Sequence, residues 1–150
     1  MKKKYEAFMA SLPEEKRKRV EGLVQFVKFG MVGGFNTVFT YVIVNVMYYA
    51  WGIHEQIGNI TAFIITVFIS YMANSRFVFR ESAKEQSFLE GLIKVYISYS
   101  ITGIFIVGVL LYVESNILHI PVYISTFVNI FITVPINFIL NKFWAYRKKS

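Results

Sequence analysis

The chain has 150 residues, is 55% hydrophobic and 18% aromatic, and carries a formal net charge of +7. A mean hydropathy of +0.49 excludes a disordered chain, because so apolar a sequence does not stay solvated. It also argues against a soluble domain, since a short chain has too little interior to bury this much apolar surface. There is no cysteine, which excludes disulfides, thiolate metal sites and cysteine nucleophiles.

The basic residues divide the chain into segments. All 16 Lys and Arg fall into three clusters, at the N-terminus, in the middle and at the C-terminus. The two stretches between them, 29–75 and 95–141, are nearly uncharged, and each is interrupted by polar residues near its middle. Because a spanning helix needs roughly 20 apolar residues, each stretch accommodates two. The sequence therefore predicts an all-α polytopic membrane protein with four transmembrane helices, at about 23–51, 57–75, 94–113 and 122–141.

The two ends of the chain lie outside this domain of residues 23–147. Residues 1–22 form a basic segment with four apolar residues at helical spacing, which favours an amphipathic element on the membrane surface over a solvated tail. These four are Tyr5, Phe8, Met9 and Leu12. Ser11 and Glu14 resemble a capping box at the start of the next helix. Residues 148–150 form a short basic tail.

The distribution of charge also predicts the orientation. No Lys or Arg lies in the two polar interruptions, whereas the termini and the middle loop contain all of them. The positive-inside rule places both termini and the middle loop in the cytoplasm, in a multi-pass protein of the cell membrane. The basic ends are expected to touch anionic membrane lipids. Nucleic acid is not an expected partner, because this charge bias is an ordinary topology signal.

The two halves resemble each other. A shift of 67 residues superposes 74–80 on 141–147, matching Asn with Asn, aromatic with aromatic and Arg with Arg. Both halves are predicted to start and end on the same side of the membrane. The sequence therefore predicts two parallel two-helix repeats, related by an axis along the membrane normal.

Polar residues recur every four positions in the second and fourth predicted helices. Residues four apart lie on neighbouring parts of a helix surface. Such residues in a membrane either hydrogen-bond to a packed helix or line a polar groove, and both interpretations remain open here. The candidates are Ser70 and Asn74 in the second helix and Asn129, Asn137 and Asn141 in the fourth, with Asn36 in the first.

Three segments resemble the GtrA-like family of four-helix membrane proteins. Residues 29–37 (FGMVGGFNT) resemble the opening of the family sequence, and residues 74–80 (NSRFVFR) resemble the end of its first half. Residues 137–144 (NFILNKFW) resemble the end of its second half. The resemblance covers about residues 26–147.

The resemblance implies a function in cell-surface polysaccharide synthesis. Family members are thought to move polyprenyl-phosphate-linked monosaccharides across the cytoplasmic membrane, between a glycosyltransferase inside and another outside. For short stand-alone members, teichoic-acid glycosylation is one such pathway. The expected partners are therefore a polyprenyl-phosphate sugar, membrane lipids and glycosyltransferases of both faces.

Site roles follow from this resemblance together with side-chain chemistry. Basic residues at the cytoplasmic ends are expected to bind the phosphate: Arg76, Arg80, Lys94, Lys142 and Arg147. Polar residues are expected to form the sugar path: Asn36, Ser70, Asn74, Asn129, Asn137 and Asn141. Three aromatic residues are expected to contact the sugar: Phe79, Trp144 and Tyr146.

The alternative interpretation is a non-transporting membrane anchor that recruits a glycosyltransferase. No nucleophile–base pair, paired carboxylates or phosphate loop is recognisable, so the sequence predicts a protein that is not an enzyme. Neither a cofactor nor a metal is expected. A homo-oligomer is a further expectation, because four short helices form a thin wall.

Topology is directly testable. A reporter fused at Gly52 is expected to be external, and a Ser82→Cys residue in this cysteine-free chain is expected to be protected in intact cells. The measurement is labelling by a membrane-impermeant maleimide, with permeabilised cells as the control. Labelling of Ser82→Cys from outside intact cells would refute the four-helix topology.

Overall fold

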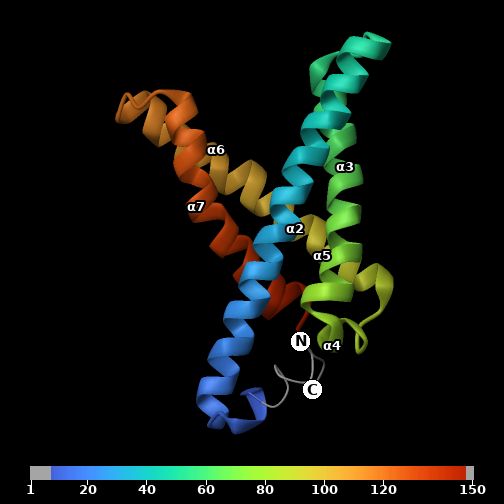
Figure 1. The fold of residues 1–150 in the computed structure, drawn as a ribbon. Coiled ribbons are helices and arrows are strands. Elements are labelled where there is room, and N and C mark those ends of the chain that lie inside the picture. The colour runs from blue at the N-terminus through green and yellow to red at the C-terminus, as the bar shows by residue number, and fades with distance from the viewer. Residues whose placement is uncertain (1–7, 148–150) are drawn as a thin grey trace.

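The computed structural model, which describes residues 8–147, shows two helical hairpins (Figure 1). The first consists of α2 (Glu14–Trp51) and α3 (Glu55–Ala73). The first arm of the second hairpin is α5 (Phe88–Ser100), η2 (Ile101–Ile106), α6 (Val107–Tyr112) and η3 (Val113–Ile117). Its second arm is α7 (Val122–Leu140), followed by η4 (Asn141–Ala145). Between the hairpins lie η1 (Asn74–Val78) and α4 (Arg80–Ala83); η marks π-helical segments.

The hairpins converge at one end and splay apart at the other (Figure 1). We call the convergent end, with the start of α2, α4 and η4, the basic end. We call the other end, with the α2–α3 and η3–α7 turns, the loop end. The gap between the hairpins widens toward the loop end, so the contacts that join them gather near the basic end.

Four helical segments are long and apolar enough to cross a membrane, which confirms the predicted all-α membrane fold. They are Glu14–Trp51, Gln56–Val78, Phe88–Ile117 and Ile124–Ala145. At about 1.5 Å per residue, α2 is roughly 57 Å long, well beyond a hydrocarbon core of about 30 Å. The charged first turns of α2 therefore extend beyond the hydrocarbon core. Ion pairs at i, i+4 link charges along those turns, as between Lys18 and Glu14 at 2.7 Å.

The start of α2 differs from the sequence prediction. Pro13 precedes the first turn, and no side chain caps it. The Ser11 hydroxyl instead donates to the Phe8 carbonyl oxygen at 2.7 Å, so the capping-box interpretation is wrong. Proline suits a helix start because its fixed φ and missing N–H cost nothing there. Tyr5, part of the predicted amphipathic segment, lies outside the described residues.

Glycine fits two places where the backbone needs it. Gly52 ends α2 with φ of 63° and lets the chain turn into α3, as predicted from the polar interruption. At Gly91 of α5, an added Cβ would lie 2.8 Å from the Tyr71 hydroxyl oxygen. The absence of a side chain at Gly91 therefore allows α5 to pack directly against α3.

Two π-helical turns occur at positions that the 67-residue shift relates. The Phe79 N–H donates to the Asn74 carbonyl oxygen at 2.8 Å, and the Tyr146 N–H donates to the Asn141 carbonyl oxygen at 2.7 Å. Both bonds span five residues, one more than in an α-helix. Each turn directs the aromatic residue that follows it, Phe79 or Tyr146, into the protein interior.

A column of four aromatic rings joins the hairpins at the basic end. Its order is Phe138, Phe79, Tyr146 and Tyr71, and successive ring centroids are 6.0, 4.7 and 6.0 Å apart. The 67-residue shift exchanges Phe79 with Tyr146 and Tyr71 with Phe138, so the column is the same from either end. The Tyr146 hydroxyl also donates to the Tyr71 carbonyl oxygen at 3.2 Å. A repeat over the full helices stays a prediction.

The column predicts a graded loss of stability. Tyr146→Ala removes a buried ring and is expected to destabilise by about 3–5 kcal/mol, whereas Tyr146→Phe removes only a hydrogen bond, about 1 kcal/mol. Trp144→Ala is the control, since Trp144 is 38% exposed. Thermal unfolding in detergent should rank the variants in that order. Equal midpoints for Tyr146→Ala and Trp144→Ala would contradict a structural role for the column.

Candidate functional site

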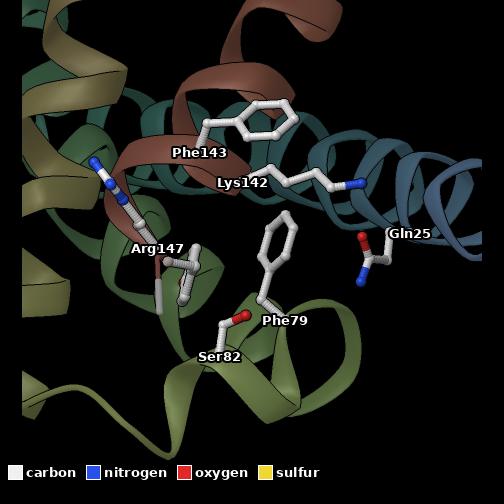
Figure 2. A pocket seen from close by; sticks show the side chains of 7 residues that line it. Gln25, Phe79, Ser82, Lys142, Phe143 and Arg147 are labelled. Atoms are coloured by element: carbon white, nitrogen blue, oxygen red, sulfur yellow. The ribbon is translucent and has the colours of Figure 1, made fainter. Parts of the chain in front are cut away.

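Pocket A is a cavity of about 500 Å³ at the basic end. Its lining residues come from α2, the start of α4 and the end of the α7 arm: Gln25, Phe79, Ser82, Lys142, Phe143, Tyr146 and Arg147. Figure 2 shows Lys142 extending toward Gln25, with the Phe79 ring between Lys142 and Ser82. The Lys142 ammonium lies 5.4 Å from the Phe138 ring centroid. Pocket A thus offers an ammonium, an amide and a hydroxyl, which suit an anionic and hydroxylated ligand, while the Arg147 guanidinium points away from the Lys142 ammonium (Figure 2).

Pocket B, of about 360 Å³, lies between α3, α4 and the start of α5. Its polar lining consists of Ser75, Arg76, Arg80, Lys84 and Gln86, and its apolar lining of Tyr71, Met72, Ala83 and Phe88. A third cavity, lined in part by Lys28 and Glu81, lies between pockets A and B: it shares Gln25, Phe79 and Ser82 with pocket A and Arg80 with pocket B. Pockets A and B share no lining residue.

The structure therefore separates the residues predicted to bind phosphate. Lys142 and Arg147 line pocket A, whereas Arg76 and Arg80 line pocket B. Within residues 8–147, these four form no ion pair. Lys94 lines neither pocket, and its ammonium binds the Glu90 carboxylate at 2.8 Å. Sequence reasoning grouped all five because it gives the depth of a residue but not its direction around the bundle.

Ser70 and Asn74 belong to a network that crosses between helices. The Asn74 amide donates to the Ser70 hydroxyl at 3.1 Å, and the Ser70 hydroxyl is 2.9 Å from that of Tyr99 on α5. Ser70 and Asn74 are fully buried. This arrangement favours the interhelical interpretation for these two residues. Tyr99 was not predicted. Its hydroxyl group inside a predicted span, close to Ser98 and Thr102 in the sequence, could have indicated a polar contact there.

The polar residues of α7 extend further toward the loop end. Asn129 is 3% exposed, and its amide donates to the Glu114 carboxylate at 3.0 Å. The sequence predicts that the third helix ends at about residue 113, but Glu114 lies in η3, within the third candidate span. The sequence missed this because the helical arm continues past the polar interruption to Ile117. A carboxylate of the third span therefore contacts the row of polar residues on α7, although the four predicted helices contain no Asp or Glu.

Five asparagines share an unusual property. Within residues 8–147, their buried Oδ1 atoms have no hydrogen-bond donor. They are Asn36, Asn74, Asn129, Asn137 and Asn141. A buried acceptor without a donor is costly unless a ligand or water satisfies it. These oxygens could accept from a molecule that brings its own hydrogen-bond donors, provided that the helices open enough to admit it, since Asn74, Asn129 and Asn141 are 0–3% exposed.

The three predicted aromatic contacts divide into two kinds. Phe79 and Tyr146 are 3% and 1% exposed and stack on each other at 4.7 Å. Tyr71 stacks on Tyr146 and Phe138 lies against Phe79, so both rings have neighbours within the column. The two rings therefore bound pocket A as a wall and do not present an open face for stacking. Trp144 is partly exposed and does not line pocket A.

Fold and site define the class: a multi-pass helical membrane protein with basic pockets at one end and, within residues 8–147, buried amide oxygens without hydrogen-bond donors along its helices. The chain belongs to the GtrA/DPMS transmembrane domain family, whose sequence profile matches residues 28–146. This confirms the predicted family resemblance.

Among curated proteins, the chain is similar to the "Bactoprenol-linked glucose translocase" of Shigella phage SfII and to the protein of the same name from Shigella phage SfV. In each case 33% of residues are identical over 64 residues, which cover 43% of this chain and 53% of the relative. The chain thus spans about half the length of these relatives. No solved structure is significantly similar.

The Ser70–Tyr99 contact predicts coupled effects on stability. Tyr99→Phe removes only the interhelical hydrogen bond and is expected to cost about 0.6–1 kcal/mol, whereas Ser70→Ala also removes the acceptor of the Asn74 amide and is expected to cost more; the double variant should cost little more than Ser70→Ala alone. Tyr41→Phe, at a tyrosine that is 70% exposed, is the control. The measurement is unfolding in detergent. Fully additive losses would show that the two hydroxyls do not act as a pair.

Proposed function

We propose that this protein translocates a polyprenyl-phosphate-linked monosaccharide across the cytoplasmic membrane, from the basic end to the loop end, to supply glycosylation of a cell-surface polymer. Both termini would be cytoplasmic. The lipid-linked sugar would come from a cytoplasmic glycosyltransferase and pass to one on the external face. The substrate is moved without chemical change. Teichoic acid as the acceptor and self-association of the protein stay predictions.

Family membership and the relatives' name support the class of substrate. Both relatives are named for a glucose carried on bactoprenol. Such a lipid has an apolar tail, an anionic phosphate and a hydroxylated head. The tail can stay in the bilayer beside the helices, because those helices expose large apolar side chains along their length. Only the phosphate and the sugar need polar partners.

Pocket A supplies partners for the polar part at the basic end. The Lys142 ammonium offers charge-assisted hydrogen bonds to a phosphate, and Arg147 adds a second positive charge at this end. Gln25 and Ser82 offer an amide and a hydroxyl to a sugar. A site with both kinds of group at one membrane surface suits the loading of a sugar-phosphate head.

The observation that carries the proposal is the set of buried amide oxygens without donors. Three of the five lie on or directly after α7, at Asn129, Asn137 and Asn141, with Thr133 between and Ser125 beyond. These residues recur every four positions over 16 residues, a rise of about 24 Å. Each step of four residues also rotates the side-chain position by about 40° around the helix axis, so this polar stripe winds around α7. Sugar hydroxyls moving along it would donate to oxygens that otherwise lack donors.

A reconstitution experiment tests the proposal. Proteoliposomes carrying labelled bactoprenol-linked glucose should lose label accessibility from one leaflet faster than protein-free liposomes. Asn137→Leu is expected to abolish this movement, because an unsatisfied hydroxyl in an apolar setting costs roughly 2–7 kcal/mol. Asn45→Leu is the matched control, since the Asn45 amide only donates to the Tyr41 carbonyl oxygen of its own helix.

Movement equal to that in protein-free liposomes would refute translocation and favour the anchor interpretation. Movement unchanged in Asn137→Leu would remove the α7 stripe from the path. Loss in both asparagine variants would point to a general requirement for helix polarity, which would also refute the path as drawn.

A further inference from the structure

The second basic pocket has no role in the loading step just described. Pocket B lies at the same end of the molecule as pocket A, yet the two share no lining residue. Their basic residues also belong to different segments of the sequence. Arg76 and Arg80 lie on either side of Phe79, whereas Lys142 and Arg147 lie on either side of Tyr146, the ring that stacks on Phe79. A single phosphate in pocket A would therefore not occupy pocket B.

Part of the lining of the two pockets is related by the repeat. The 67-residue shift maps Ser75, Arg76 and Arg80 of pocket B onto Lys142, Phe143 and Arg147 of pocket A. The first two residues of each set lie within a π-helical turn that begins at a buried asparagine, and the arginine lies two residues after that turn. The repeat thus places one arginine, Arg80 or Arg147, at related positions of the two pockets, whereas Phe79 and Tyr146, which the shift also relates, both line pocket A.

Donors dominate the polar side of pocket B. The Arg76 and Arg80 guanidinium groups form no ion pair within residues 8–147, whereas the Lys84 ammonium binds the Glu81 carboxylate at 3.0 Å. The Gln86 Nε2 atom is buried without an acceptor in the described part of the chain. Two planar guanidinium forks and an unpaired amide donor match the oxygens of a phosphate.

The rest of the lining of pocket B is apolar. It consists of Met72, Ala83, Phe88 and the Tyr71 ring, and Phe88 is the first residue of α5. Phe88 is itself 48% exposed. A ligand that fills the pocket therefore has a phosphate next to an apolar chain, as in the head of a polyprenyl phosphate.

We propose that pocket B is a second phosphate site, which binds a sugar-free polyprenyl phosphate while pocket A is occupied. This inference rests on the proposed function. The sugar-free lipid, which the cytoplasmic glycosyltransferase uses as its acceptor at this same face, is a phosphate monoester, with a charge of about −1.5 to −2. The sugar-linked diester carries a single negative charge. The smaller pocket, with its two unpaired guanidinium groups, suits the sugar-free monoester.

Counting bound lipids tests the second site without any transport. Native mass spectrometry in detergent, with farnesyl phosphate as the probe, should show two molecules bound to the wild-type chain at saturation. Arg76→Gln with Arg80→Gln should bind one, and so should Lys142→Gln with Arg147→Gln. The control is Arg17→Gln with Arg19→Gln, which removes two exposed guanidinium groups from α2 and should still bind two.

The source of the phosphate is tested separately. Inorganic phosphate at equal concentration should not displace farnesyl phosphate, because it has no chain to place against Phe88 and Met72. Single variants Arg76→Gln and Arg80→Gln should each weaken the second binding step by about tenfold. Displacement by inorganic phosphate would instead assign the pocket to a free anion and overturn the lipid assignment.

Three results would overturn the second site: one molecule bound at saturation to wild type, two still bound when both pocket B arginines are replaced, or equal loss in the α2 control. Failure of translocation in liposomes with two lipids bound would refute only the proposed function. Translocation with one lipid bound would refute only pocket B as a site.

Discussion

The aromatic column at the basic end is the contact on which the rest of the molecule depends. Phe138, Phe79, Tyr146 and Tyr71 come from both hairpins, and no comparable ring column joins the hairpins elsewhere in residues 8–147. Lipid gives little hydrophobic drive for helices to associate, so packing and hydrogen bonds must hold them together. Stacked rings supply dense packing at one level of the membrane. The two π-helical turns matter because each delivers one central ring to the column.

The column also decides where the charged groups lie. A residue one position beyond each central ring is an arginine, Arg80 after Phe79 and Arg147 after Tyr146. Because the two rings lie at the centre of the column, the arginines that follow them lie outside the column, at two separate cavities.

The two halves of the chain differ toward the loop end. There α7 has Ser125 and Asn129 where the 67-residue shift finds Gly58 and Ala62 on α3. The polar stripe therefore approaches the far side of the membrane along α7, and along α3 it does not.

Much of the fold could be predicted because the membrane imposes a simple pattern. Long apolar runs between basic clusters gave four helices, and Gly52 marked a turn that the structure contains. Contacts between helices were harder. Phe79 and Tyr146 lie where the sequence would suggest an aromatic belt at the membrane surface, yet their rings are buried against each other. Lys94 was grouped with the other basic residues because of its expected depth in the membrane, although its ion-pair partner Glu90 lies one helical turn before it. Tyr99 and Glu114 were missed because their importance comes from neighbours 29 and 15 residues away.

Because the hairpins splay apart, the aromatic column is placed where a hinge between them would lie. Contacts gathered at one end make that end a pivot, and the arms beyond it act as levers. A rotation of about 10° at the pivot displaces points about 30 Å away, the thickness of the hydrocarbon core, by about 5 Å. Small adjustments of ring stacking at the basic end would thereby be amplified into large changes in the distance between the hairpins at the loop end.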